Sequence, residues 1–391
     1  MSAPGTTRAR PPLWRDVRVL RLAFQVVAVV AVGALIAYLY DNLQANQRDL
    51  DLPRGYGFLD EPAEFRIAYS DFSSRDTVWN ALLVGLRNTL AVALVGMALT
   101  LLLGTLVGIA RLSSNWLVRK AAGAYVEAVR NAPPLLVIIF VNSVALTSLP
   151  PIDDAYEAPG GTLLLSVREM GVVTLRDDGG ATTYGLALVA GVALAVGLGW
   201  WLTRRETETG RPARRWTWGA AVLLTIAVGG YLVLGQPVRL SHPEVVGRSV
   251  EGGIAMGLPF FSVLVGVVLY TTTHVAEIVR GSILAVPRGQ TEAATALGLS
   301  AGQRLRHVVL PQAFRVAVPP TINQFLNLTK NTSLGVAVAY AELMSVTKTV
   351  ISSGNPAIQS ILVAMGLYLV LSLSISLFAN LASRRLRLVE R

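Results

Sequence analysis

The sequence has no cysteine and few charged residues, and both deficits narrow what the protein can be. Without cysteine, disulfide bonds, thiolate catalysis and cysteine-ligated metal sites are excluded. Charged residues make up only 15% of the chain, whereas a soluble domain usually has about a quarter. Hydrophobic residues make up 53%, and the mean hydropathy is +0.53. The composition therefore indicates an integral membrane protein.

Signatures of catalysis and of metal binding are also missing from the sequence. No Gly-x-x-x-x-Gly-Lys-Ser/Thr segment occurs, so the chain lacks the loop that cradles nucleotide phosphates. The histidines His242, His274 and His307 are scattered and do not have the spacing of metal ligands. The sequence also shows no recognisable Ser/His/Asp pattern of the kind used in nucleophilic catalysis. We therefore expect neither catalytic residues nor a metal site on this chain.

The net charge of +10 could suggest a nucleic-acid partner. However, no basic stripe is interleaved with aromatic residues, as nucleic-acid binding would favour. Arginines on the cytoplasmic loops of a membrane protein explain the charge better. We expect the lipid bilayer, and no nucleic acid, around this chain.

Long apolar runs recur along the whole sequence. A span needs about 20 residues to cross a hydrocarbon core of roughly 30 Å. We predict an all-α integral membrane protein with about eight transmembrane helices. The expected spans are 22–40, 88–110, 122–148, 184–202, 217–235, 259–281, 317–340 and 357–382.

The distribution of positive charge predicts the orientation of these spans. Segments on the side of the N-terminus hold 21 lysines and arginines, whereas the opposite segments hold nine. Because cytoplasmic loops are enriched in Lys and Arg, we expect both termini in the cytoplasm. On the opposite side, the connector 41–85 contains eight acidic residues and forms either a small ordered cap or a loose loop.

The hairpin 184–235 differs from the other predicted spans because it carries no polar residue at mid-depth. We interpret it as an addition that serves packing or lies at the periphery. Its tryptophans are typical of the aromatic belt at a membrane interface. They are Trp200, Trp201, Trp216 and Trp218.

One predicted span is polar where lipid should forbid it. Asn323, Asn327, Lys330 and Asn331 fall at i, i+4, i+7 and i+8, which places them on one stripe of a helix. A lysine at mid-span costs roughly 2.5 kcal/mol or more. We predict that the stripe lines a solute path, and interhelical hydrogen bonding by the same amides is the alternative.

A second polar cluster lies in residues 271–281. His274 and Glu277 are one helical turn apart, and both are candidates for the solute path. Arg280 follows Glu277 at i+3, so a structural ion pair between the two is also expected. The sequence alone does not decide between a role in the solute path and a structural ion pair.

The stretch 288–311 must lie in water between two spans, and it indicates two short helices. Gly298 is a plausible left-handed end of the first helix. Ser300 and Gln303 form a capping box that starts the second, and Pro311 is expected to end it. Such a shaped loop suggests docking to a partner. An amphipathic helix that touches only lipid headgroups, through Leu305, Val308 and Val309, is the alternative.

These segments together resemble the permease subunits of ABC importers for polar amino acids. The resemblance covers roughly 85–148 and 259–385, with the order of motifs preserved. It is carried by GLRNTL at 85–90, ARLSS at 110–114, YVEAVRNAPPLL at 125–136 and the long run from VAEIVRG to KNTSL at 275–334. One departure is the Asn-Ala-Pro-Pro-Leu-Leu sequence at 131–136, where many relatives have Asn-Thr-Pro-Leu-Leu.

The resemblance implies a fold and a division of the chain. The fold would be a type I ABC importer permease core with an extra N-terminal helix and an inserted helical hairpin. Residues 86–148 and 259–391 would form the core, flanked by the N-terminal segment 1–85 and interrupted by the insertion 149–258. These additions resemble the larger permease of the general L-amino-acid and the glutamate/glutamine/aspartate/asparagine systems.

The resemblance also implies a role for the loop 288–311, as the family's EAA coupling loop. Its short helices would dock in a groove of a cytoplasmic ATPase. The coupling residues carried over are Glu292, Ala293, Ala294, Gly298, Leu299, Leu310 and Pro311.

The partners that the resemblance implies are a second, different permease chain, two ATPase subunits and a periplasmic amino-acid-binding protein. ATP and Mg would be held by the ATPase, so no cofactor is expected on this chain. The location would be the bacterial inner membrane, and the substrates polar L-amino acids. Two other classes are the alternatives: an ion-coupled secondary transporter, for which inverted repeats and buried acidic residues are not evident, and a non-transporting anchor for a signalling ATPase.

Overall fold

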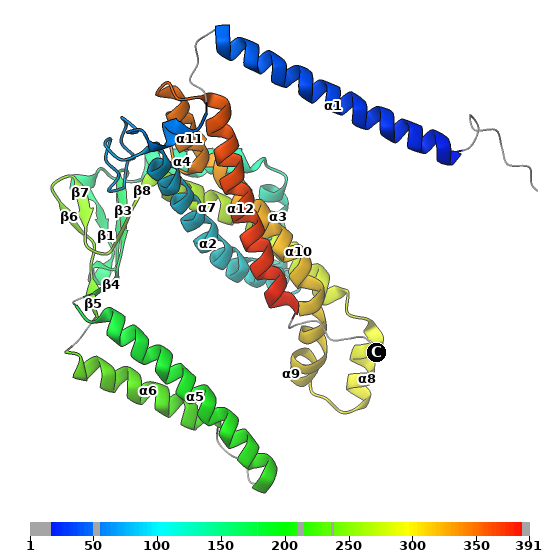
Figure 1. Ribbon diagram of the computed structural model, residues 1–391. Helices are drawn as coiled ribbons and strands as arrows, with labels where there is room; N and C mark the ends of the chain where they lie inside the picture. Colours follow the sequence, from blue (N-terminus) through cyan, green and yellow to red (C-terminus); the bar gives the residue numbers. More distant parts are fainter. Residues whose placement is uncertain (1–16, 50–54, 178, 210–214, 236–237, 385–391) are drawn as a thin grey trace, which may run out of the picture.

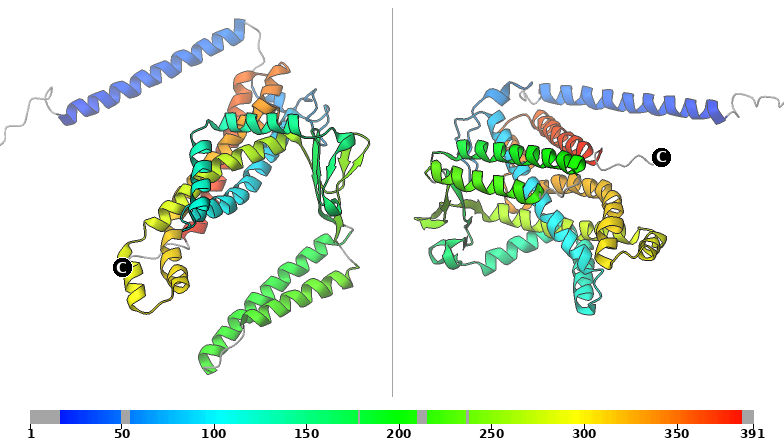
Figure 2. Two further views of the ribbon diagram at one scale, coloured as in Figure 1. Left: turned by 180° about the vertical axis from the view of Figure 1, so that it is seen from behind. Right: turned by 90° about the horizontal axis from the view of Figure 1, so that it is seen from below.

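The computed structural model describes residues 17–49, 55–177, 179–209, 215–235 and 238–384. Among these residues, six helices are long and apolar enough to span a membrane, and two bent helix pairs raise the number to eight. The eight predicted spans are therefore matched only if each bent pair is counted as one span. The first helix, α1 (Val17–Asp49), is exposed along its apolar length and runs apart from the other helices (Figures 1 and 2).

The centre of the fold is the packing of α2 (Val78–Ala110) along α7 (Leu258–Leu284). Glycines allow the two backbones to approach closely. A Cβ at Gly104 would lie 2.6 Å from Val275 Cγ1, and one at Gly108 would lie 2.8 Å from the Ala276 carbonyl oxygen. The Gly-x-x-x-Gly spacing therefore serves helix packing inside this chain.

The predicted continuous span 122–148 is wrong, because the structure divides it into two helices. Helix α3 (Trp116–Arg130) and α4 (Pro134–Ser148) meet at an angle of 107°. Pro133 disfavours the helical conformation at the preceding residue, whereas Pro134 is tolerated at the start of a new helix. Helix α4 then packs on α7, where a Cβ at Gly266 would lie 2.7 Å from Ile138 Cγ1.

The described residues of the connector form an ordered cap rather than a loose loop. A 3-10 turn at Gly57–Asp60 is followed by an irregular segment that reaches α2. The buried side chains of Phe58, Ile67 and Phe72 pack in one cluster with the start of α2 and with the helices near the C-terminus.

The insertion contains short strands that the sequence did not predict. An antiparallel sheet has the order β1 (Tyr156–Glu157), β2 (Leu163–Leu165), β3 (Glu169–Val172), β8 (Ile254–Gly257). Two ribbons pair β4 (Thr174–Asp177) with β5 (Val238–Ser241) and β6 (Glu244–Val246) with β7 (Ser249–Glu251).

The predicted hairpin consists of α5 (Ala181–Thr209) and α6 (Arg215–Val233), and it connects strand β4 to strand β5 (Figure 1). The two helices pack on each other. Gly191 admits the side chain of Ile226, and the Tyr184 hydroxyl donates to the Ala227 carbonyl at 2.9 Å. The hairpin thus has its own internal contacts, as expected for an addition.

The last helices meet at a buried polar joint. Helix α10 (Leu310–Asn331) continues as a 3-10 segment (Thr332–Val338), the chain turns at Ala339 with φ +56°, and α11 (Leu343–Ser352) and α12 (Ala357–Arg384) follow. Glu342 is fully buried and caps α11, where its carboxylate accepts from the backbone N–H groups of Met344 and Ser345 at 2.9 and 2.6 Å. The Tyr368 hydroxyl of α12 donates to the same carboxylate at 2.6 Å.

Helix α2 completes this joint. The Asn88 side chain donates to the Ala341 carbonyl at 2.8 Å, and the Leu343 N–H donates to the Thr89 hydroxyl at 3.1 Å. The Tyr340 hydroxyl donates to the Asn88 carbonyl at 2.9 Å. The polar groups around Glu342 therefore tie α2, α11 and α12 to the end of the α10 segment.

We expect Gly104→Ala to destabilise the fold by about 1–3 kcal/mol, because the added methyl group overlaps Val275 in a packed interface. The measurement is the thermal unfolding midpoint of the purified chain in detergent. Gly123→Ala in α3 is the control, because its Cβ would have no atom within 4 Å. Equal midpoints for both variants would contradict the close α2–α7 packing.

We also expect Glu342→Ala to lower the unfolding midpoint, because it leaves the donors of Met344, Ser345 and Tyr368 unsatisfied. Each buried donor without a partner costs about 1–3 kcal/mol. Glu342→Gln keeps one acceptor oxygen and should fall between the alanine variant and the wild type. Removal of the exposed carboxylate in Glu157→Ala is the control and should leave the midpoint unchanged.

Candidate functional site

The loop 288–311 folds as two short helices joined by a defined bend, as predicted. Helix α8 (Arg288–Ala296) ends in a Schellman motif. The N–H of Leu299 donates to the Ala294 carbonyl at 3.1 Å, and that of Gly298 donates to the Thr295 carbonyl at 2.9 Å. Gly298 has φ +76°, a conformation that glycine adopts without strain.

Helix α9 (Ala301–Arg304) starts at the predicted capping box. The Gln303 N–H donates to the Ser300 hydroxyl at 3.4 Å, and the Ser300 N–H donates to the Gln303 side-chain oxygen at 3.0 Å. The sequence pattern therefore identified both the end of the first helix and the start of the second.

The prediction that Pro311 ends this second helix is wrong. A π-turn (Leu305–Val309) follows α9, and α10 then begins at Leu310 with Pro311 in its first turn. The Leu310 N–H donates to the Leu305 carbonyl, five residues back. Pro311 lacks a backbone N–H, but residues in the first turn of a helix do not need this donor. The π-turn just before Pro311 shifts the backbone hydrogen-bond register, so that a new α-helix can begin there. The loop 288–311 consequently runs into the polar span without an interruption.

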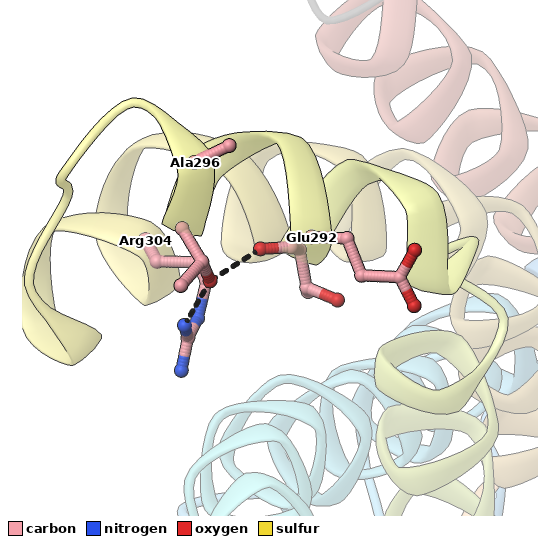
Figure 3. A pocket seen from close by; sticks show the side chains of 5 residues that line it. Glu292, Ala296 and Arg304 are labelled. Carbon is pink, nitrogen blue, oxygen red and sulfur yellow. Dashed lines mark hydrogen bonds between the residues drawn. The ribbon is translucent and has the colours of Figure 1, made fainter.

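The two helices border a shallow, open hollow of about 560 Å³ on the loop (Figure 3). It is lined by Thr291, Glu292, Thr295, Ala296 and Arg304. The Arg304 guanidinium donates to the Thr295 hydroxyl at 2.7 Å, and this hydroxyl donates to the Thr291 carbonyl at 2.7 Å. Helix α9 is thereby fixed across the hollow to α8.

Glu292 is exposed, and its carboxylate points away from Arg304 in Figure 3. Among the residues that the structure describes, it forms no ion pair. A free carboxylate at the rim of a hollow is available to a partner.

The other predicted coupling residues divide between the surface and the interior. Ala293 is exposed, whereas Ala294 is buried and Leu299 is half-buried, so these two hold the bend. Leu310 lines an apolar groove of about 230 Å³ between α2, α7 and α10.

The sequence did not single out Leu297, which follows the last residue of α8 and whose side chain is 80% exposed. An apolar residue directly before the glycine of a loop in water was the available signal. A single exposed apolar side chain is ordinary on a protein surface, so Leu297 is a candidate contact only because it shares the loop with the exposed Glu292.

The predicted polar stripe lies on the surface of this chain. Asn323, Asn327 and Lys330 are exposed, and Asn331 is half-buried. None of the four side chains has a hydrogen-bond or ionic partner among the described residues. The helix continues through Pro319 and Pro320, and its α-helical geometry ends at Asn331.

His274 and Glu277 have partners within the chain. The Glu277 carboxylate accepts from Arg280 at 2.9 Å, as predicted, and it also pairs with Arg111 at the end of α2. The His274 ring lies 4.8 Å from the Tyr270 ring, and its Nδ1 is 3.3 Å from the Tyr270 carbonyl. Their polar contacts are therefore to α2 and α7, and a role in the solute path stays a prediction.

Comparison of the sequence with known proteins identifies the family of this chain. Residues 100–388 match the family described as binding-protein-dependent transport system inner membrane component. The chain is 36% identical to the general L-amino acid transport system permease protein AapQ of Rhizobium johnstonii, over 96% of this chain and 94% of that protein.

Two further relatives cover the chain to a similar extent. A putative amino-acid ABC transporter permease protein, YhdX of Escherichia coli, is 36% identical over 94% of both chains. The glutamate/glutamine/aspartate/asparagine transport system permease protein BztB of Rhodobacter capsulatus is 35% identical over 96% of both. The match across both halves of the core shows that this chain belongs to the family of binding-protein-dependent transport system inner membrane components.

Proposed function

We propose that this chain is the membrane-spanning permease subunit of an ATP-driven importer of polar L-amino acids. The observation that carries the proposal is one helical path: α8 and α9 form the docking loop, and the π-turn joins this loop to α10, which bears the polar stripe. Force applied to the loop would therefore move the stripe directly. The names of the relatives support amino acids as the substrates.

The proposal assigns the energy source to another chain. This sequence has no phosphate-cradling loop, so ATP and Mg would be bound by a cytoplasmic ATPase, two copies of which complete the assembly. The exposed Glu292 and Leu297 on the rim of the loop are the groups we assign to the contact with it. The loop then lies in the cytoplasm of a bacterial cell, together with both chain termini.

The stripe on α10 supports a path shared with a second permease chain. Exposed amides and an ammonium group inside a span are costly against lipid. They are compatible with the membrane where another chain or a water-filled path covers them. Asparagine side chains donate and accept hydrogen bonds, so they suit both the carboxylate and the ammonium group of an amino acid. Lys330 would attract the carboxylate.

The second permease chain would be a homologue rather than a copy, and a periplasmic binding protein would deliver the substrate. Such a heteromeric assembly matches the subtype that the sequence resembles. The ordered cap and the sheets of the insertion lie on the side away from the docking loop, which is the side we assign to the periplasm (Figure 1). This placement leaves the cap and the sheets on the face that the binding protein approaches.

We expect Glu292→Ala and Leu297→Ala to weaken the attachment of the ATPase and to lower ATP-dependent uptake by about tenfold or more, because each removes more than 1.4 kcal/mol of contact energy. Attachment is measured by co-purification, and uptake with radiolabelled amino acid in proteoliposomes. Glu208→Ala, which removes an exposed carboxylate from the α5–α6 hairpin rather than from the loop, is the matched control. Normal attachment and uptake in both loop variants would refute the docking assignment.

We expect Asn323→Ala, Asn327→Ala and Lys330→Gln to lower uptake while the assembly remains intact. A hydrogen bond to a charged group contributes about 1.5–3 kcal/mol, which corresponds to roughly ten- to hundredfold. Lys330→Gln should also weaken the preference for acidic over neutral amino acids.

The control for the stripe is Ser374→Ala in α12. The Ser374 hydroxyl is exposed and already bonded to the Val370 carbonyl of its own helix. If all three stripe variants transport like the wild type, with unchanged selectivity, the stripe does not line the path.

A further inference from the structure

The free end of the α5–α6 hairpin carries a cluster of stacked arginines and tryptophans. The Arg204 guanidinium carbon lies 3.7 Å from the centroid of the Trp200 ring, and that of Arg205 lies 5.1 Å from the Trp201 ring. On α6, Arg215 lies 5.7 Å from the Trp216 ring. We call these six residues the hairpin tip. Such cation–π stacking fixes each guanidinium over an aromatic face.

The hairpin tip is open to its surroundings. Trp200 is 61% exposed and Trp216 is 81% exposed, and all three arginines are exposed. Among the described residues, none of these arginines forms an ion pair with the nearby Glu206 or Glu208. The Arg215 guanidinium also donates to the Thr203 hydroxyl at 3.4 Å. The positive charge of the tip is therefore not neutralised within the described residues of the chain.

The rest of the hairpin is built to face lipid. Its outer surface exposes large apolar side chains along both helices. They include Leu186, Val189, Leu194, Leu224 and Val228. The segment 181–202 has a length of about 33 Å at 1.5 Å per residue, which matches a hydrocarbon core of about 30 Å. An apolar helix of this length places Trp200 to Arg205 at the depth of the lipid headgroups.

This end of the hairpin and the α8–α9 loop both lie at the lower end of the molecule, away from the sheets (Figure 1). They therefore belong to the same face of the membrane. The sequence places that face in the cytoplasm by its excess of Lys and Arg. Anionic lipids give such a surface a negative potential, which attracts basic groups.

We propose that the hairpin tip binds the phosphates of anionic phospholipid headgroups and so anchors the hairpin at the membrane surface. A guanidinium stacked on an indole keeps its N–H edge free, and this planar fork matches two phosphate oxygens. The indoles lie beside it at the level where tryptophan partitions. An acidic protein surface would satisfy the charge but would not require three exposed indoles at the lipid boundary.

The test is lipid binding by the purified full-length chain in detergent. Mixed micelles contain phosphatidylglycerol or phosphatidylcholine with brominated acyl chains, which quench tryptophan fluorescence on contact. Four of the seven tryptophans belong to the hairpin. We expect stronger quenching by the anionic lipid, and we expect salt to reduce the difference.

The triple variant R204Q/R205Q/R215Q should lower the apparent affinity for phosphatidylglycerol by on the order of tenfold or more. The matched control R75Q/R168Q/R248Q removes the same charge from exposed positions on the cap and the insertion. It should bind the anionic lipid like the wild type. The thermal unfolding midpoint without lipid should be the same for all three proteins, which separates lost binding from lost folding.

Two results would overturn the proposal. The wild type could show no preference for the anionic lipid, or the triple variant could retain the wild-type preference. A triple variant that retains it and also loses its association with the ATPase on co-purification would assign the tip to a protein surface. Because inorganic phosphate has no acyl chains to hold it at the indoles, it should not displace the brominated lipid at equal concentration.

Discussion

The fold depends on how it accommodates one carboxylate, that of Glu342, with no exposed surface inside a membrane protein. A buried charge is tolerated only if its hydrogen-bonding capacity is met. Two backbone N–H groups at the start of α11 and the Tyr368 hydroxyl meet it. Because these donors come from α11 and α12, the carboxylate can be satisfied only when the two helices are docked. Asn88 and Thr89 add α2 to the same joint.

The position of this joint ties one end of α10 to the core, whereas the other end runs into the α8–α9 loop. The tied end lies beyond the 3-10 segment, where the chain turns at Ala339 and is tied to α2. The other end joins the loop of α8 and α9, which leaves Glu292 and Leu297 exposed and is the part that we propose the ATPase moves. If the loop moves as we propose while the joint stays in place, the residues of α10 between the two are displaced. The polar stripe occupies this interval.

Local signals in the sequence predicted the local structure well. The glycine of the Schellman motif and the capping box at Ser300 are satisfied by residues within five positions, so their pattern is legible without the fold. The effect of Pro311 was mispredicted because it depends on a π-turn that shifts the register ahead of it. The break between α3 and α4 was missed because apolar composition on both sides of Pro133 hid a bend of 107°. The strands of the insertion have two to four residues each and leave little alternation to detect.

The polar groups of the candidate site show what sequence alone could not distinguish. Asn88, Glu342 and Asn327 are polar residues within or next to predicted spans, and residue type alone does not say which of them bonds within the chain. The structure separates them by partner: Asn88 and Glu342 are satisfied within the chain, whereas Asn327 and its neighbours on the stripe remain exposed without one among the described residues. Polar groups that hold the fold have their donors and acceptors matched internally, because an unmatched group in the bilayer is expensive. Among the residues that the structure describes, the unmatched stripe is therefore the exposed polar surface on which our proposal of a shared solute path rests.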